Sequence, residues 1–289
     1  MRKLILGVAA AAIVGVSSPI QAQDLGPTLN RIAERGMVNL GHREASVPFA
    51  YIGDDGEPVG YSIDLCLHIV DRIEEAIGVE ELEIRYIPVN PQTRIPLMAN
   101  GTIDLECGST TNNFTRQQQV DYAFTTFITG TKILTRKDSG IETVEDLAGQ
   151  SIALAQGTTN ERAILQAIEE REIEDVNVLN VRDHSEGFLA LETDRVDAYS
   201  TDDILLYGLI STAREPDQYA VVGEYISYDP YAIMVPQNDS QFRRVANMAL
   251  ADLFRSGEIE TIYEKWFGPM GVPMSDELKA AIKLQALPE

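Results

Sequence analysis

The chain has 289 residues, with 45 acidic against 23 basic side chains, and its formal net charge is −22 at pH 7. A surface of this charge repels nucleic acid and anionic lipid, so the chain is not expected to bind nucleic acid. The length allows one large domain or two smaller ones.

The N-terminal residues have the pattern of a secretory signal peptide. Arg2 and Lys3 precede an apolar run over 4–16, and Ala22 stands at a suitable cleavage point. The alternative is a membrane anchor, but the run is shorter than the ~20 residues that a spanning helix needs. Cleavage after Ala22 would leave 21 basic and 45 acidic residues, a net charge of −24. We therefore expect residues 1–22 to be removed from a secreted chain.

Hydrophobic patterns along the rest of the chain indicate alternating strands and helices. Segment 62–78 is expected to be a helix, because Leu65, Ile69 and Ile73 recur every four residues between caps at Ser62 and Gly78. In the first unit, strands are expected at 37–43, 82–89 and 102–107, with a short helix at 92–101. In the second unit, strands at 151–155, 176–181 and 196–201 alternate with helices at 157–170, 184–194 and from 202 onward. Two further helices are expected between 238 and 267, with a break at Gly257.

This alternation indicates a parallel-type α/β fold. Two such units are separated by extended stretches at 127–132 and 224–231. The chain is therefore expected to leave one lobe, build a second and return. The expected first lobe combines 23–128 with 229–289, and the second covers 129–228 with a hinge strand at each end.

Arginines are the best candidates for a functional site in the first unit. The sequence contains no motif for a metal, a nucleotide or a catalytic triad, so no metal and no cofactor are expected. Arg43, Arg94 and Arg116 each follow the end of an expected strand, and so does the small polar loop 108–113. Ligands of open α/β sheets bind at the carboxyl ends of strands, and arginine recognises carboxylate through parallel donors. The pattern indicates an anion site, although each arginine alone could be a solvated surface residue.

The second unit offers three more candidate positions. The turn 156–161 leads into a helix whose N-terminus suits an anion, although these residues are equally good helix caps. Asp202 and Asp203 follow an expected strand, where one could cap the next helix and the other could face a ligand ammonium. His184 opens another helix, where a capping or surface role is the alternative.

Cys66 and Cys107 are the only cysteines in the chain. An oxidising compartment favours a disulfide between them, because Cys66 is expected on the buried side of a helix that covers the strand ending at Cys107. The alternative is two separately buried thiols.

Several segments resemble the periplasmic amino-acid-binding proteins of ABC transporters, in particular the glutamate/aspartate-binding branch of solute-binding protein family 3. They are "GHREASVPFAY", "GYSIDLC", "RIPLMANGTIDLECGSTTNN", "GTTNE", "RDHSEGF", "STDDILL" and "SGEIETIYEKWFG", which together span nearly the whole mature chain. The resemblance implies a type II periplasmic binding protein fold, in which two lobes joined by two extended hinge strands close over one ligand.

The resemblance also implies which residues hold the α-amino-acid part of a ligand. Arg116, helped by Ser109 and Thr111, would bind the α-carboxylate. Thr159 would offer its hydroxyl and backbone donors to the same group. Asp202 would bind the α-ammonium.

The side-chain carboxylate of an acidic ligand would be recognised by Arg43, Arg94 and His184, again as the resemblance implies. Pro91 stands where relatives can carry a small hydroxyl residue. This difference leaves the preference between glutamate and aspartate open.

The implied function is periplasmic capture of L-glutamate and L-aspartate by a monomer, for import through an ABC permease in the inner membrane. Alternatives are a binder of glutamine or another polar amino acid, a ligand relay to a chemoreceptor, or a periplasmic cyclohexadienyl-acid dehydratase on the same fold. The dehydratase would need a general acid or base, for which Glu44 and Glu106 are the candidates.

Overall fold

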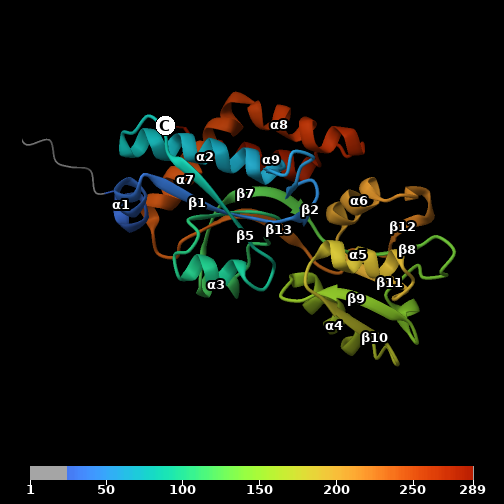
Figure 1. Cartoon of the computed structure of the whole chain (residues 1–289). Coiled ribbons are helices and arrows are strands. Elements are labelled where there is room, and N and C mark those ends of the chain that lie inside the picture. Colours follow the sequence, from blue (N-terminus) through green and yellow to red (C-terminus); the bar gives the residue numbers. More distant parts are fainter. Residues whose placement is uncertain (1–24, 289) are drawn as a thin grey trace, which may run out of the picture.

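The computed structural model describes residues 25–288, and the expected signal peptide at 1–22 lies outside them. Two open five-stranded sheets, each with its own helices, form two lobes side by side (Figure 1). Among the described residues, no helix has the length and apolar character needed to cross a membrane.

The first sheet has the strand order β5-β1-β6-β13-β7. Strand β1 pairs in parallel with β5 and β6, whereas β13 pairs antiparallel with β6 and β7. The strands are β1 (Met37–His42), β5 (Glu83–Pro88), β6 (Leu105–Cys107), β7 (Asp121–Thr129) and β13 (Asp229–Val235). A small separate sheet contains β2 (Ala45–Ser46), β3 (Ala50–Ile52) and β4 (Pro58–Val59).

The second sheet repeats this plan with the order β10-β9-β11-β8-β12. Strand β9 pairs in parallel with β10 and β11, and β8 pairs antiparallel with β11 and β12. The strands are β8 (Thr131–Arg136), β9 (Ser151–Ala155), β10 (Asn177–Val181), β11 (Ala198–Asp202) and β12 (Tyr219–Val222). In each sheet the antiparallel strand next to the parallel ones, β13 or β8, follows directly after the chain has crossed from the other lobe.

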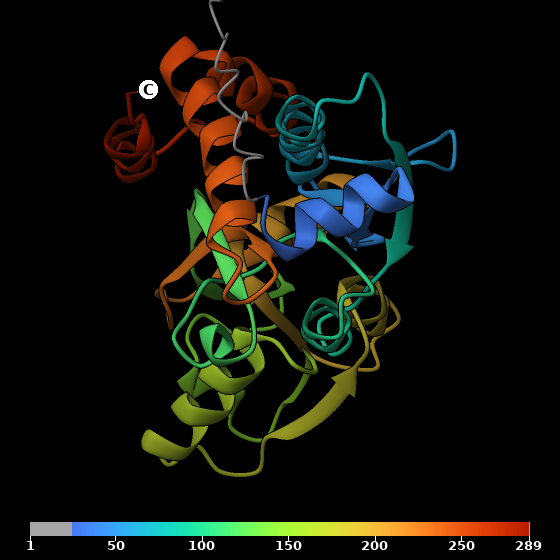
Figure 2. The same cartoon turned by 90° about the vertical axis from the view of Figure 1, so that its left-hand side faces the viewer.

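Helices cover both lobes. The first lobe carries α1 (Gly26–Arg35), α2 (Tyr61–Ile77), α3 (Arg94–Ala99), α7 (Ser240–Ser256), α8 (Glu258–Phe267) and α9 (Asp276–Gln285). The second carries α4 (Thr159–Glu170), α5 (His184–Glu192) and α6 (Asp203–Thr212). Single turns occur at η1 (Arg116–Gln118), η2 (Glu145–Leu147), η3 (Pro216–Gln218) and η4 (Gly268–Met270). In Figure 2, α7 runs along the outside of the first lobe with α1 beside it, and both helices contact each other.

The predicted buried face of helix α2 is confirmed, whereas the predicted N-cap, Ser62, is wrong. Leu65, Ile69 and Ile73 are fully buried, and the helix ends at Gly78 with a left-handed φ of 74°. The residue at the start is Gly60, with φ 136°, where a Cβ would lie 2.3 Å from the carbonyl oxygen of Phe49. Ser62 lies inside the helix instead and donates its hydroxyl to Gly108 O at 2.9 Å.

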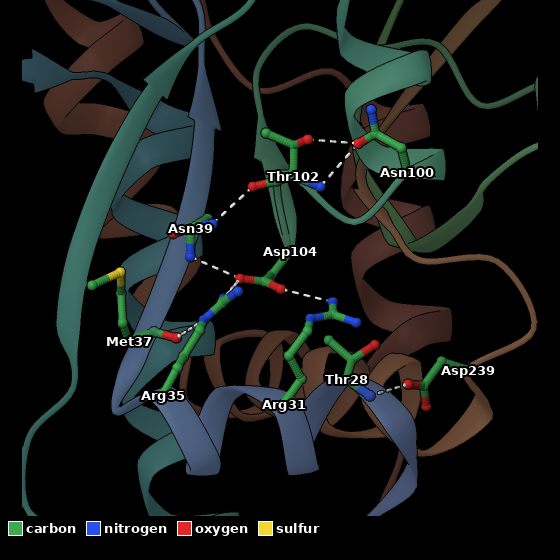
Figure 3. Close-up of polar contacts among 9 residues, drawn as sticks. All are labelled: Thr28, Arg31, Arg35, Met37, Asn39, Asn100, Thr102, Asp104 and Asp239. Carbon is green, nitrogen blue, oxygen red and sulfur yellow. Dashed lines mark hydrogen bonds and ion pairs between the residues drawn. The ribbon is translucent and has the colours of Figure 1, made fainter.

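Helix α1, which the sequence patterns did not predict, is held by two carboxylates (Figure 3). Asp104, fully buried just before β6, accepts hydrogen bonds from Arg31 and Arg35 of α1. Asp104 also accepts from the backbone N of Asn39 in β1, at 2.8 Å. Asp239, which caps α7, accepts from the backbone N of Thr28 at 2.9 Å. Polar groups of α1 therefore attach the helix to the rest of the lobe.

The chain crosses between the lobes twice. Strands β7 and β8 belong to different sheets and are joined by Gly130 alone, and residues 223–228 join β12 to β13. The two crossings lie against each other, because a Cβ on Gly130 would come within 2.2 Å of Ser227 O. Ile204 and Leu205 of α6 are part of the same buried cluster as Phe49 and Phe127, so the second lobe also contacts the aromatic core of the first.

Candidate functional site

A disulfide joins α2 to the end of β6. Cys66 and Cys107 are bonded with an S–S distance of 2.14 Å and a Cα–Cα distance of 6.1 Å. The predicted bond is confirmed, and the alternative of two free thiols is wrong. Because Cys107 is the last residue of β6, the bond fixes the point at which the polar loop 108–113 leaves the sheet.

Three buried arginines lie at the carboxyl ends of the parallel strands of the first lobe. Arg43 follows β1, Arg94 opens the helix after β5, and Arg116 follows the loop after β6. Each is at most 7 % exposed, which rules out the alternative of solvated surface residues. Arg94 Nη1 donates to Ser109 O at 3.1 Å and to the Thr110 hydroxyl, and Arg116 Nη1 donates to Thr111 O at 2.8 Å.

The second lobe presents three helix N-termini at the matching strand ends. Thr159 is the first residue of α4, His184 is the first residue of α5, and Asp202 ends β11 directly before α6. The capping oxygens of α4 and α5 belong to the preceding residues, Thr158 and Asp183, which accept from the backbone in the first turn. Thr159 and His184 are therefore not used as caps, and both are buried.

Contacts between the lobes bring the two sets together. Thr111 Oγ1 lies 3.2 Å from Thr159 Oγ1, and Arg116 Nη2 donates to Gly157 O at 3.3 Å. At the crossing, Tyr231 OH donates to Asp202 Oδ2 at 2.5 Å. All eight predicted site residues are buried, at most 9 % exposed: Arg43, Arg94, Ser109, Thr111, Arg116, Thr159, His184 and Asp202.

Several donors at the site have no hydrogen-bond partner within residues 25–288. They are Nη2 of Arg43, Nε of Arg94 and the hydroxyl of Ser109. A buried polar group without a partner costs about 1–3 kcal/mol, so three at one place indicate a site built for an acceptor-rich group. Two of the three belong to cations, which suits a carboxylate.

Electrostatics at the arginines favour an anion. Burial is the main cause, and the charge of Arg94 the second, that lowers the pKa of both Arg43 and Arg116 to about 10. Both arginines therefore remain charged at neutral pH. Burial, and next Arg43, lower the pKa of His184 well below its ordinary value. His184 is therefore neutral at pH 7, with Nδ1 2.7 Å from Tyr199 OH. An anionic group at this place would relieve repulsion between the arginines.

The opposite end of the site is acidic. Burial, and next the charge of Asp229, raise the pKa of Asp202 well above its ordinary value. Asp229, at the start of β13, is itself buried and accepts from Thr111 Oγ1 at 2.8 Å. The sequence reasoning missed both Asp229 and Tyr231, because an extended stretch gives no local signal that one of its carboxylates meets another lobe. Two adjacent buried carboxylates suit a bound cation.

The two carboxylates considered for catalysis lie in different surroundings. Glu44 is exposed, whereas Glu106 is fully buried and accepts from the hydroxyl of Thr110 at 2.6 Å. Within the described part of the chain, no three His, Cys, Asp or Glu side chains gather to hold a metal ion. The arrangement can hold a molecule with a positive group at one end and negative groups near the arginines.

Comparison with known proteins gives the family. Residues 38–269 match the bacterial extracellular solute-binding proteins, family 3. The L-glutamate/L-aspartate-binding protein of Pseudomonas aeruginosa is 43 % identical over 92 % of this chain and 91 % of its own length. The glutamate/aspartate import solute-binding protein of Salmonella typhimurium is 37 % identical over 98 % of this chain and 97 % of its own.

A solved structure agrees with these matches. An ancestral arginine-binding protein bound to glutamine superposes with a TM-score of 0.71 at 29 % identity, covering 81 % of this chain and 99 % of that one. The relatives are binding proteins associated with transport, so the chain is a binding protein and the dehydratase alternative is not supported. The chain belongs to the bacterial extracellular solute-binding proteins, family 3.

Proposed function

We propose that this protein captures L-glutamate and L-aspartate in the periplasm and delivers them to an ABC permease in the inner membrane. The observation that carries the proposal is the burial of three arginines in the first lobe and of Asp202, which meets Tyr231 of the first lobe, in the second. Such a set matches a zwitterion with one additional carboxylate. The two relatives are glutamate/aspartate-binding proteins, which supports the same ligand class.

Each end of the ligand has its own residues in this proposal. Arg116 binds the α-carboxylate with help from Ser109, Thr111 and Thr159. The α-ammonium binds Asp202, and the nearby charge of Asp229 strengthens the attraction.

The side-chain carboxylate binds Arg43 and Arg94, whose Nη2 and Nε atoms have no other partner in the described chain. His184 acts there as a neutral hydrogen-bonding group, since its pKa is lowered well below the ordinary value by burial and by Arg43. Long-range repulsion from the net charge of −22 is screened beyond about 8 Å at physiological salt, so the arginines dominate at short range.

Binding is coupled to closure in this proposal, because each lobe supplies part of the site. The lobes would move as the units 23–128 with 229–289 and 129–228, about the crossings at Gly130 and at residues 223–228. The protein would act as a monomer whose closed form the permease recognises. Removal of residues 1–22 would release it into the periplasm.

Calorimetric titration tests the proposal directly. The protein is unfolded and refolded to remove bound ligand and then titrated with each of the twenty common amino acids. Glutamate and aspartate are expected to bind, and glutamine is expected to bind at least about 100-fold more weakly, a difference of about 2.7 kcal/mol, because it cannot neutralise an arginine. Equal binding of glutamine and glutamate would refute the assignment of an acidic ligand in favour of a polar one, and the family would remain the same.

A further inference from the structure

Glu106 is a carboxylate in an unusual place. It is the middle residue of β6, a strand with neighbours on both sides, where it pairs with Gly41 of β1 and Met234 of β13. The residue is fully buried. A carboxylate at such a position is costly unless hydrogen bonds and opposite charges compensate it, so its surroundings should explain it.

One oxygen of Glu106 is connected to a binding arginine. Oε2 accepts the hydroxyl proton of Thr110 at 2.6 Å, and the oxygen of the same hydroxyl accepts from Nη1 of Arg94. Arg94 is fixed further by Ser109 O, at 3.1 Å. The carboxylate therefore lies behind Arg94, one hydroxyl away.

The other oxygen, Oε1, lies beside a second arginine. It has no hydrogen-bond partner within residues 25–288. A Cβ on Gly108 would lie 2.3 Å from this oxygen and 2.9 Å from Cγ of Arg43, so Gly108 allows both side chains to lie against the same backbone atom. No carboxylate of the described residues forms a direct ion pair with Arg43 or Arg94. The charge of Glu106 acts on Arg43 through space, and Glu106 is linked to Arg94 by the Thr110 hydroxyl.

We propose that Glu106 limits the preference of the site for an acidic ligand over a neutral one, because it balances charge at the side-chain end of the ligand site. It cancels one of the two positive charges of Arg43 and Arg94, so the closed site offers one net positive charge, which matches a group with a single negative charge. The proposal rests on the proposed function, because it assumes that these two arginines face the ligand's side chain. Without Glu106, two buried cations would face one carboxylate, and release of the acidic ligand would be slower.

The matched variants Glu106→Gln and Thr110→Val separate charge from position. Glu106→Gln keeps the size of the side chain and its accepting oxygen but removes the negative charge. Thr110→Val breaks the hydroxyl link to Arg94 but keeps every charge. For each protein, calorimetry gives the ratio of the dissociation constants of glutamine and glutamate, in which a general loss of stability cancels.

Glu106→Gln is expected to widen this ratio by about tenfold, 1.4 kcal/mol, in favour of glutamate, because the field of the arginines is no longer opposed. Thr110→Val is expected to leave the ratio equal or smaller. Glu106→Asp restores the charge and is expected to return the ratio toward that of the parent. An unchanged or smaller ratio in Glu106→Gln would overturn the proposal, since a purely structural role predicts that outcome.

A measurement on the unaltered protein covers the case in which Glu106→Gln does not fold. Carboxyl ¹³C NMR of the glutamate-bound protein is expected to show Glu106 ionised at neutral pH, and a protonated carboxyl would overturn the proposal. Failure of the unaltered protein to bind glutamate would instead reject the proposed function. If the parent prefers glutamate but Glu106→Gln leaves the ratio of the glutamine and glutamate dissociation constants unchanged, only the role of Glu106 is rejected.

Discussion

Replacing Arg116 with methionine is expected to weaken ligand binding strongly while leaving the ligand-free fold about as stable as before. Burial and Arg94 lower the pKa of Arg116 to about 10, so keeping this charge inside the fold costs on the order of 3 kcal/mol. Its hydrogen bonds to Thr111 O at 2.8 Å and Gly157 O at 3.3 Å return about 1–1.5 kcal/mol each. The two contributions nearly cancel, and methionine retains most of the packing volume.

Binding should respond very differently, because the α-carboxylate of the ligand would be buried without its counter-ion. Loss of one partner of a buried charge pair costs roughly 3–5 kcal/mol, which raises the dissociation constant at least about 100-fold. Urea unfolding of ligand-free protein measures the first effect, and calorimetry with glutamate measures the second. Arg214→Met, at an exposed arginine, is the matched control and should change neither.

Two results would refute this reasoning. If Arg116→Met binds glutamate as tightly as the parent, Arg116 does not hold the α-carboxylate. If the variant instead loses more than about 3 kcal/mol of unfolding free energy, the residue is mainly a structural anchor between the loop and the second lobe.

Four further outcomes are expected. Reduction of the disulfide between Cys66 and Cys107, which are 41 positions apart, should lower the free energy of unfolding by about 4 kcal/mol in urea melts with and without reductant. Small-angle scattering of ligand-free protein should give a smaller radius of gyration after glutamate is added, and an unchanged value at saturation would count against lobe closure. Because the pKa of Asp202 is raised, the ligand-free fold should lose stability as pH rises from the ordinary carboxyl range through that raised value. Asp202→Asn should remove this loss. The variant should therefore show a smaller difference in melting temperature between about pH 5 and about pH 7 than the parent. Asp104→Asn should lower the free energy of unfolding by about 1–3 kcal/mol, because this buried carboxylate accepts from two arginines and a backbone amide; no change in the urea midpoint would show that the partly exposed arginines re-solvate without cost.

The sequence allowed prediction of features that short-range patterns determine. Strands and helices could be assigned from their periods, and residues at strand ends, such as Arg43 and Arg116, could be expected to meet because carboxyl ends of parallel strands share one edge. Gly78 and Gly257 end helices with left-handed φ values of 74° and 79°, as their residue type indicates.

Features that depend on distant contacts could not be predicted in this way. Helix α1 has few apolar residues, and its main anchor, Asp104, is about seventy positions later in the chain. Asp229 contributes to the site only because the second crossing brings it into contact with Thr111 and near Asp202. Ser62 looked like a helix cap because serine is common there, but Gly60 is required by the close approach of Phe49.

The position of β13 between β6 and β7 has a consequence for the order of folding. As the chain emerges, residues 131–222 can complete the second sheet from one continuous segment. The first sheet cannot close until Val235 is available, since β6 and β7 do not pair with each other and would present open edges. A chain that stops before β13 is therefore expected to contain one finished lobe and one aggregation-prone half, already crosslinked between Cys66 and Cys107 if oxidation has occurred.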